Sequence, residues 1–374
     1  MNQAIKIGLL LFALAILQWH CVQSYVSPYV SPKTGYLVVE GYISGNGPSS
    51  YRLSRTISLA GDSAIPAVTG ANLQIEGTDN STYPLTELGN GYYLLPGAPL
   101  NSNTRYRLRI SNVGTEQYLS DYVTYKQAPP IDSVNWIQDA SGVALFVNTH
   151  DPTNSTRYYQ WKYNETWEYF AFDDSGVIWE NDSIVYRPPQ QQIYQCYHLD
   201  SSSQILINTS EKLARDEIYR QPLVSYAPST QPLAQVYSIL VSQYALTDSA
   251  YTYLSEMRTN TEQLGSIFDA QPTNLIGNIH SLSNPAEPVL GYISAGAVTQ
   301  QRIYITHQQL ANWLYEPSCT LKDTSVPNNP AAGALLDFDY IPIDLTMGII
   351  SANLTVCVDC RAQGGTTVKP PYMP

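Results

Sequence analysis

Several stretches of the chain alternate between apolar and polar positions, which is the pattern of a β-strand with one buried face. Residues 105–110 read Arg-Tyr-Arg-Leu-Arg-Ile, and residues 71–76 alternate in the same way. The run at 36–43 is rich in residues that favour strands. Turn-forming residues, such as Gly-Asn-Gly at 89–91, separate these runs. Short strands at this spacing predict an antiparallel β-sandwich over residues 36–127.

A second β-rich region follows Ala-Pro-Pro at 128–130, which we interpret as a domain boundary. Its longest alternating stretch, 158–170, places Tyr159, Trp161 and Tyr163 on one face. Such an aromatic face is typical of a core or an inter-sheet contact, and it also suits a ligand-binding platform. We favour the core interpretation and keep these three residues as candidate binding residues.

The last third of the chain mixes strand and helix patterns. Residues 289–295 and 302–305 are predicted strands. One helix is predicted to begin at the Thr-Asp cap at 247–248 and to end near residue 265. A short second helix is predicted over 306–315, beginning at Thr306, which has Gln309 at capping-box spacing. The predicted fold class is therefore mainly β: an N-terminal antiparallel sandwich, then a β-rich region over 128–374 with a few short α-helices.

The first 21 residues have the pattern of an export signal. The apolar run at 7–17 is too short for a transmembrane helix, which needs roughly 20 apolar residues, but it has the length of a signal-peptide core, about 7–15 residues. Cys21 then stands where a bacterial lipoprotein carries its lipid, although Trp19 and His20 replace the usual small residues. The alternatives, an uncleaved anchor or a plain secretory signal, still export the chain.

A tether is predicted over residues 22–35. The unit Tyr-Val-Ser-Pro occurs there twice, at 25–28 and 29–32. Residues before proline prefer extended backbone, so this segment would act as a semi-rigid spacer between a membrane and the folded body.

Composition excludes several classes of function. The chain has 374 residues, a formal net charge of −12 and no cluster of Lys or Arg, which argues against nucleic-acid binding. No second long apolar run follows the signal, so no later segment is expected to span a membrane. The length suffices for two or three domains with their own cores. The 30 tyrosines suit both strands and contact surfaces.

Beyond Cys21, the chain contains four cysteines: Cys196, Cys319, Cys357 and Cys360. An even number in an exported chain predicts disulfides. Three pairings are open: the two close cysteines with each other and the other two together, or either pairing that cross-links the C-terminal tail to the body.

The close pair at 357 and 360 also matches half of a zinc site or a redox motif. A four-cysteine zinc site usually needs a second close pair, which is missing here. A thioredoxin-like pair stands at a helix start in an α/β context, whereas residues 352–356 are strand-like. We therefore favour a structural staple.

Catalytic and metal-binding motifs are missing from the sequence. None of the five histidines has a partner at metal-ligand spacing. The chain also contains no nucleophile elbow and no phosphate-binding glycine loop. We therefore predict no catalytic residues, no metal and no cofactor.

Several blocks of the sequence together resemble a Bacteroidetes lipoprotein family named domain of unknown function 4249. The resemblance covers nearly the whole mature chain. Its most specific part is the closing Cys-Val-Asp-Cys-Arg, Gly-Gly-Thr and Lys-Pro, at 357–361, 364–366 and 369–370. The other blocks are residues 37–41, 52–56, 196–197, 237–244, 265–269, 277–280 and 289–292.

The resemblance implies an envelope lipoprotein that often accompanies TonB-dependent transporters and has no established activity. We therefore expect a non-enzymatic lipoprotein of the outer membrane, anchored through Cys21 on the periplasmic or cell-surface face. Its expected role is that of an accessory binding protein for a TonB-dependent transporter or for nutrient uptake. The alternatives are an envelope hydrolase acting on peptides or glycans, and a structural or adhesive surface lipoprotein.

Overall fold

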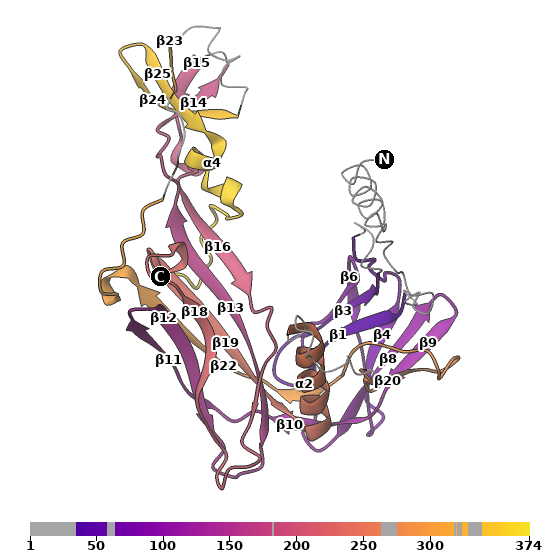
Figure 1. Ribbon diagram of the computed structural model, residues 1–374. Helices are drawn as coiled ribbons and strands as arrows, with labels where there is room; N and C mark the ends of the chain where they lie inside the picture. The colour runs from indigo at the N-terminus through magenta and orange to yellow at the C-terminus, as the bar shows by residue number, and fades with distance from the viewer. Residues whose placement is uncertain are drawn as a thin grey trace, which may run out of the picture.

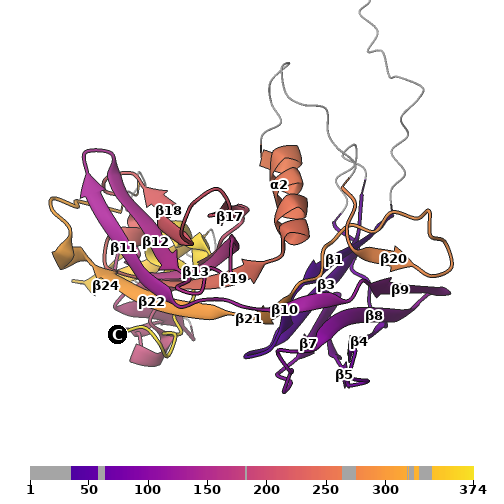
Figure 2. The same cartoon turned by 90° about the horizontal axis from the view of Figure 1, so that it is seen from below.

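Two β-sandwiches stand side by side, and a smaller β-module extends from the far end of the second one (Figure 1). Figure 2 shows the two sandwiches from below, with strands running from one to the other. The predicted mainly β fold is confirmed. Within the residues that the structure describes, no helix is long and apolar enough to span a membrane. The computed structural model describes residues 35–57, 64–181, 183–262, 275–317, 319, 324–327 and 339–374.

The first sandwich packs a smaller sheet against a larger one. The smaller sheet has the order β1 (Leu37–Gly41), β3 (Ser49–Arg55), β7 (Tyr92–Leu95) and β6 (Thr86–Gly89). The larger sheet has the order β2 (Ile43–Ser44), β21 (Ala295–Ala297), β10 (Val123–Gln127), β8 (Arg105–Val113), β4 (Asn72–Gly77) and β5 (Thr82–Pro84), with β9 (Glu116–Ser120) and β20 (Ile279–Ser281) attached through β8. The alternation predicted at 105–110 is confirmed, because Tyr106, Leu108 and Ile110 lie buried in the core.

The first sandwich also takes strands from much later in the chain. β20 pairs with β9, and β21 pairs in parallel with both β2 and β10. Ile279, Val289 and Ile293 from this segment lie in the core of the first sandwich. The sequence predicts this segment within the second region, 128–374, and that prediction is wrong for residues 279–297. The predicted break at 128–130 does fall between the two sandwiches.

The second sandwich encloses its core between two antiparallel sheets. One sheet has the order β11 (Ile131–Asp139), β12 (Gly142–His150) and β18 (Glu217–Tyr226). The other has the order β16 (Gln195–Ser201), β13 (Tyr158–Phe170), β19 (Val236–Leu246) and β22 (Thr299–Thr306), with β17 (Leu206–Thr209) also paired to β13. The 3-10 turn η2 (Gln231–Leu233) precedes β19, and η3 (His307–Gln309) follows β22. β13 has the predicted bounds.

The distal module combines two segments that lie far apart in the sequence. An insertion between β13 and β16 gives the hairpin β14 (Val177–Glu180) and β15 (Ser183–Tyr186), then η1 (Pro189–Gln191). The later segment gives a sheet of β23 (Thr324–Pro327), β25 (Ile349–Leu354) and β24 (Tyr340–Thr346), followed by α4 (Thr355–Val358) and η4 (Cys360–Gln363). Buried Ile350 packs against Trp179 and Ile184, so the two segments share a small core.

Helix α2 (Asp248–Glu262) lies between the two sandwiches (Figures 1 and 2) and begins where the sequence predicts. The Thr247 hydroxyl accepts a hydrogen bond from the amide of Ala250 at 3.2 Å, as a helix cap does. The predicted helix end near Gly265 lies outside the described residues.

The helix predicted over 306–315 is wrong in its length. The capping box is present, but only the single turn η3 follows it, and Leu310 is already extended, with φ −102° and ψ 134°. Extended backbone brings Trp313 into the core, where it is 2% exposed and its Nε1 donates to the carbonyl of Thr230 at 3.0 Å. Burial of a large aromatic side chain therefore outweighs local helix propensity.

Candidate functional site: a cleft between the sandwiches

The three aromatic residues predicted as binding candidates lie in the core of the second sandwich. Tyr159 and Trp161 are fully buried, and Tyr163 is 8% exposed. The Tyr159 hydroxyl donates to the carboxylate of Asp216, and Trp161 Nε1 donates to Oε1 of Gln243 at 2.8 Å. The binding interpretation of these three residues is therefore wrong, because their side chains are enclosed between two sheets. The core interpretation of the same pattern is right.

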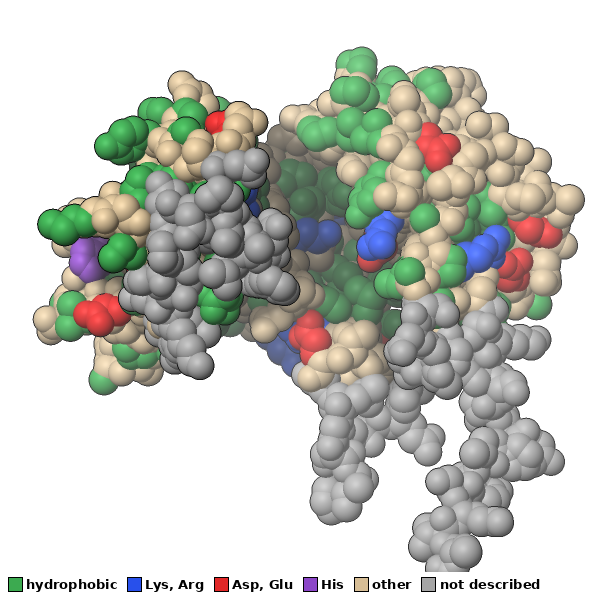
Figure 3. All heavy atoms as spheres, turned by 90° about the horizontal axis from the view of Figure 1, so that it is seen from above, with side chains coloured by type: hydrophobic (Ala, Val, Ile, Leu, Met, Phe, Trp, Pro, Cys, Tyr) green, Lys and Arg blue, Asp and Glu red, His purple; other side chains and the backbone are tan. Residues whose placement is uncertain are grey.

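The opposite face of β13 meets a cleft between the two sandwiches. Because side chains alternate along a strand, Lys162 and Asn164 point away from the core. The cleft has a volume of about 350 Å³, and Figure 3 looks down on the hollow between the two bodies, where Lys or Arg side chains are visible. The first sandwich lines it mainly with the β2–β3 turn, and the second lines it with β13, β19 and β22 through Lys162, Asn164, Ser242, Tyr244 and Gln300.

The β2–β3 turn is fastened to the second sandwich by Asn46. Its Nδ2 donates to the carbonyl of Val298 at 2.8 Å, and its Oδ1 accepts from the amide of the same residue at 2.9 Å. Val298 is the single residue between β21 and β22. A nearly continuous strand therefore passes from the first sandwich into the second, and the wall of the cleft is bonded to it.

A second crossing runs beside the first. The carbonyl of Pro129, between β10 and β11, accepts from Nε2 of Gln243 at 2.9 Å and from the hydroxyl of Thr299 at 2.8 Å. Within the larger sheet of the first sandwich, a Cβ at Gly296 would lie 1.8 Å from the carbonyl oxygen of Lys126, so only glycine lets β10 and β21 approach this closely. These two bonded crossings hold the sandwiches in one arrangement, so the cleft is preformed.

Two tyrosine rings and one ammonium group line the cleft and are the groups that could contact a ligand through aromatic and charge interactions. The rings of Tyr42 and Tyr244 meet edge to face with centroids 4.9 Å apart. Lys162 Nζ lies 5.9 Å from the centroid of the Tyr244 ring. Burial lowers the pKa of Lys162, and the charge of Glu40 acts in the opposite direction. Burial raises the pKa of both tyrosines, which keeps them neutral.

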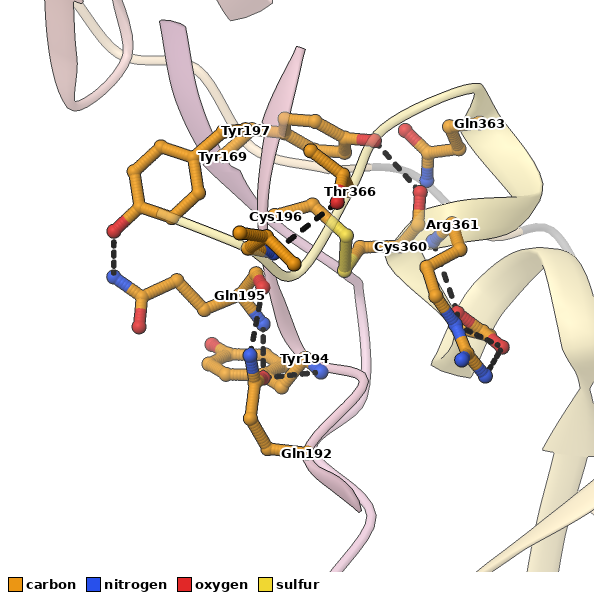
Figure 4. Close-up of a disulfide and its surroundings, with 12 residues drawn as sticks. Tyr169, Gln192, Tyr194, Gln195, Cys196, Tyr197, Cys360, Arg361, Gln363 and Thr366 are labelled. Atoms are coloured by element: carbon orange, nitrogen blue, oxygen red, sulfur yellow. Dashed lines mark hydrogen bonds and ion pairs between the residues drawn. A yellow bond between two sulfur atoms is a disulfide. The ribbon is translucent and has the colours of Figure 1, made fainter. Parts of the chain in front are cut away.

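Two disulfides fix the C-terminal segment to the body. Cys196 in β16 is bonded to Cys360 in η4 (Figure 4), and Cys319 is bonded to Cys357 in α4, with Cα atoms 5.7 and 5.8 Å apart. This is one of the two pairings that cross-link the tail to the body, so the staple interpretation is confirmed. Each cysteine of the close pair is bonded to a distant partner, which leaves no free pair for zinc or for thiol exchange.

Hydrogen bonds extend the staple at Cys360. The hydroxyl of Tyr169 donates to the carbonyl of Cys360 at 2.6 Å. The backbones of Tyr197 and Thr366 exchange two hydrogen bonds, at 2.8 and 2.9 Å, so the tail adds a short bridge to the edge of β16. The sequence could not reveal this pairing, because the partners lie far apart along the chain.

The end of the tail lies on the same sheet face that lines the cleft. The hydroxyl of Tyr372 lies 3.0 Å from the hydroxyl of Thr166 on β13. The guanidinium of Arg302 on β22 stacks over the Tyr372 ring at 3.9 Å, and Tyr304 donates to the Tyr372 carbonyl at 2.5 Å. The tail therefore covers one part of this face and leaves the part facing the first sandwich open.

The predicted signal peptide, the lipid-attachment residue Cys21 and the tether, apart from its last residue, lie outside the described residues. Among the residues that the structure describes, no group of three or more His, Cys, Asp or Glu side chains could hold a metal ion.

These features define the class of protein as a multidomain β-sandwich protein with disulfide staples and a polar cleft between two sandwiches. A family model described as "Domain of unknown function (DUF4249)" matches residues 24–302. That match covers most of the chain, and the chain belongs to this family.

Solved structures to which the chain is similar include the following two. One is the two fibronectin type-III domain segment from chicken tenascin, at 10% identity over 57% of this chain and 93% of that chain, with a TM-score of 0.16. The other is the chicken interferon gamma receptor alpha chain, at 10% identity over 58% of this chain and 91% of that chain, with a TM-score of 0.15. TM-scores this low support no conclusion about this chain. No curated protein matches its sequence.

Proposed function

We propose that this protein is a non-enzymatic, lipid-anchored binding protein of the outer membrane. The observation that carries the proposal is the preformed cleft between the sandwiches. Its walls are held by two hydrogen-bonded crossings, at Val298 and at Pro129. They present hydroxyl, amide and aromatic groups and one ammonium to the solvent. Convergent polar groups on a rigid scaffold are typical of a recognition site.

Two features support a location in the cell envelope. The short apolar run before Cys21 is typical of an export signal, and acylation of that cysteine would anchor the chain. The four other cysteines are joined in two disulfides, which persist in oxidising compartments such as the periplasm or the cell surface. Residues 22–35 would then space the folded body from the membrane.

The partner that we propose is a TonB-dependent transporter, which the family resemblance implies for an envelope lipoprotein of Bacteroidetes. The protein would serve as an accessory to that transporter in nutrient uptake. Its cleft would hold the nutrient ligand.

An enzymatic role is not favoured by the described part of the chain. A hydrolase would need paired carboxylates, or a histidine beside a carboxylate, inside a pocket. The described lining of the cleft contains no Asp, Glu or His. Two His–Asp pairs, His150 with Asp132 at 2.8 Å and His280 with Asp121 at 3.3 Å, lie on the exposed surface.

Co-purification from envelopes in mild detergent tests the proposal. We expect a TonB-dependent transporter to be recovered with the natural chain and with the control variant Asn135→Trp, whose exposed side chain lies on β11 outside the cleft. Asn164→Trp fills the cleft that holds the ligand, so it should leave recovery of the transporter unchanged and reduce the amount of nutrient ligand that co-purifies. A transporter that never co-purifies, or a ligand recovery that is the same with Asn164→Trp, would count against the proposal.

A further inference from the structure

Lys162 differs from a neighbouring cation because no described side chain forms an ion pair or a hydrogen bond with its ammonium group. Arg302 donates to the hydroxyl of Ser238 at 2.7 Å and stacks on the ring of Tyr372 in the tail, so its guanidinium already has partners within the fold. Among the described residues, Lys162 forms no ion pair or hydrogen bond; its Nζ lies near the ring of Tyr244, and the charge of Glu40 acts on it only from beyond ion-pair distance. In a chain with a formal net charge of −12, an unpaired ammonium in a cleft is a local site for an anion.

The neutral part of the lining is rich in hydroxyl and amide groups. The hydroxyl oxygen of Ser242 accepts from Nε2 of Gln300 at 2.8 Å, which leaves its proton free to donate. Asn164 donates through Nδ2 to the hydroxyl of Ser201 at 2.7 Å and keeps its carbonyl oxygen as an acceptor. A ligand that matches these groups carries several hydroxyls of its own.

We propose that the cleft binds an acidic saccharide of one or two rings, with its carboxylate held by the ammonium of Lys162. Its hydroxyls pair with Ser242, Asn164 and Gln300, and its apolar ring face packs on Tyr244. The volume of about 350 Å³ is near the lower end of ligand pockets, roughly 300–1,000 Å³, and therefore suits a ligand of this size. This inference rests on the proposed binding function and names the class of ligand.

The geometry favours a saccharide over a peptide. Peptides are commonly recognised by an exposed sheet edge or by apolar pockets for side chains. This cleft is lined by the face of the sheet, where the strands β13, β19 and β22 already pair with one another. Apart from the tyrosines, the large apolar residues in the described lining of the cleft are Pro48 and Val298.

Binding measurements on the full chain in mild detergent test the inference. An array of uronic-acid and sialic-acid oligosaccharides, each with a neutral counterpart, identifies the best probe, and calorimetry measures its affinity. We expect the acidic probe to bind about tenfold or more tightly than its neutral counterpart, because a hydrogen bond to a charged group is lost with the carboxylate. Lys162→Met should lower the affinity for the acidic probe to that of the neutral sugar.

Two further variants separate the charge from other effects. Lys162→Arg keeps the positive charge and should stay within about threefold of the natural affinity. Lys212→Met removes an exposed cation outside the cleft and should change nothing. Unchanged thermal unfolding of all three variants shows that the fold is intact.

Equal binding of acidic and neutral sugars, an unaffected Lys162→Met variant, or tighter binding of a peptide carboxylate would overturn the inference. So would an array on which the natural chain binds no acidic saccharide. These results leave the proposed function standing if the transporter still co-purifies, whereas failure of both experiments rejects both proposals.

Discussion

Glu76 on β4 is held between two guanidinium groups of the neighbouring strand β8. Its carboxylate lies 2.7 Å from Arg107 and 2.5 Å from Arg109, and Gln74 donates to it at 2.8 Å. Burial alone would raise the pKa of Glu76, but the hydrogen bonds from these three side chains outweigh it and lower the pKa to about 2. The stability of the first sandwich therefore depends on pH through the ionisation of this one side chain.

The pH dependence of this contribution has a definite sign. The pKa of Glu76 is about 2 in the folded protein and ordinarily 4.5, so its contribution to stability is complete above about pH 4.5 and is lost as the pH falls towards about 2. We expect Glu76→Gln to lower the unfolding free energy by about 1 kcal/mol at pH 7 and by less at pH 3. Denaturant unfolding at both pH values measures this. Equal destabilisation at the two pH values would contradict it.

The side chain of Gln243 joins the crossing at Pro129 to the core of the second sandwich. It is fully buried, accepts from Trp161, and donates to the Pro129 carbonyl and the Thr149 hydroxyl. Gln243→Ala leaves these partners unsatisfied, and we expect it to lower the unfolding free energy by about 2–3 kcal/mol. The control Gln160→Ala, on the outward face of β13, should cost less than about 0.5 kcal/mol. Similar losses in both variants, measured by chemical unfolding, would argue against this role.

At the scale of secondary-structure elements, the strands that the sequence predicts correctly are mainly those in which apolar and polar residues alternate. The stretches 105–110 and 158–170 lie in β8 and β13, because one face of each meets a core. The strand predicted over 289–295 is wrong for most of its length, since Leu290 forms only a single bridge. The strand that does form, β21, reads Ala-Gly-Ala, which has no hydrophobic pattern to find.

Pairing of the cysteines is another property that the sequence leaves open, and it has a measurable consequence. The Cys196–Cys360 bond joins residues that are 164 positions apart, and the Cys319–Cys357 bond joins residues that are 38 positions apart. In the chain-entropy model these loops correspond to about 5 and about 4 kcal/mol. Replacing the first pair by serine should therefore destabilise the protein more than replacing the second.

Removal of the first disulfide should also loosen the tail. We expect trypsin to cleave after Arg361 faster in the Cys196→Ser, Cys360→Ser variant than in the Cys319→Ser, Cys357→Ser variant. Non-reducing chemical unfolding and timed digestion measure the two effects. If loss of the longer loop proved the milder change, or if the tail stayed equally protected, the staple would not act as described.

At the scale of the whole molecule, the cleft combines residues that no short stretch of sequence contains. Asn46 and Val298 are 252 positions apart, and Lys162 and Tyr244 come from two further strands. Alternation predicts that Lys162 points away from the core, but not that the first sandwich stands opposite it. For this reason the sequence placed the candidate binding residues on the wrong face of β13, and only the return of the chain through β21 creates the site.

The function proposed for the whole molecule requires an exported, acylated chain with oxidised cysteines. Mass spectrometry of the intact, non-reduced protein isolated from the envelope of its own cells measures all three properties directly. We expect a mature chain that begins at an acylated Cys21 and contains the linked pairs Cys196–Cys360 and Cys319–Cys357. A full-length chain without acyl groups and with free thiols, recovered from the cytosol, would contradict the proposal.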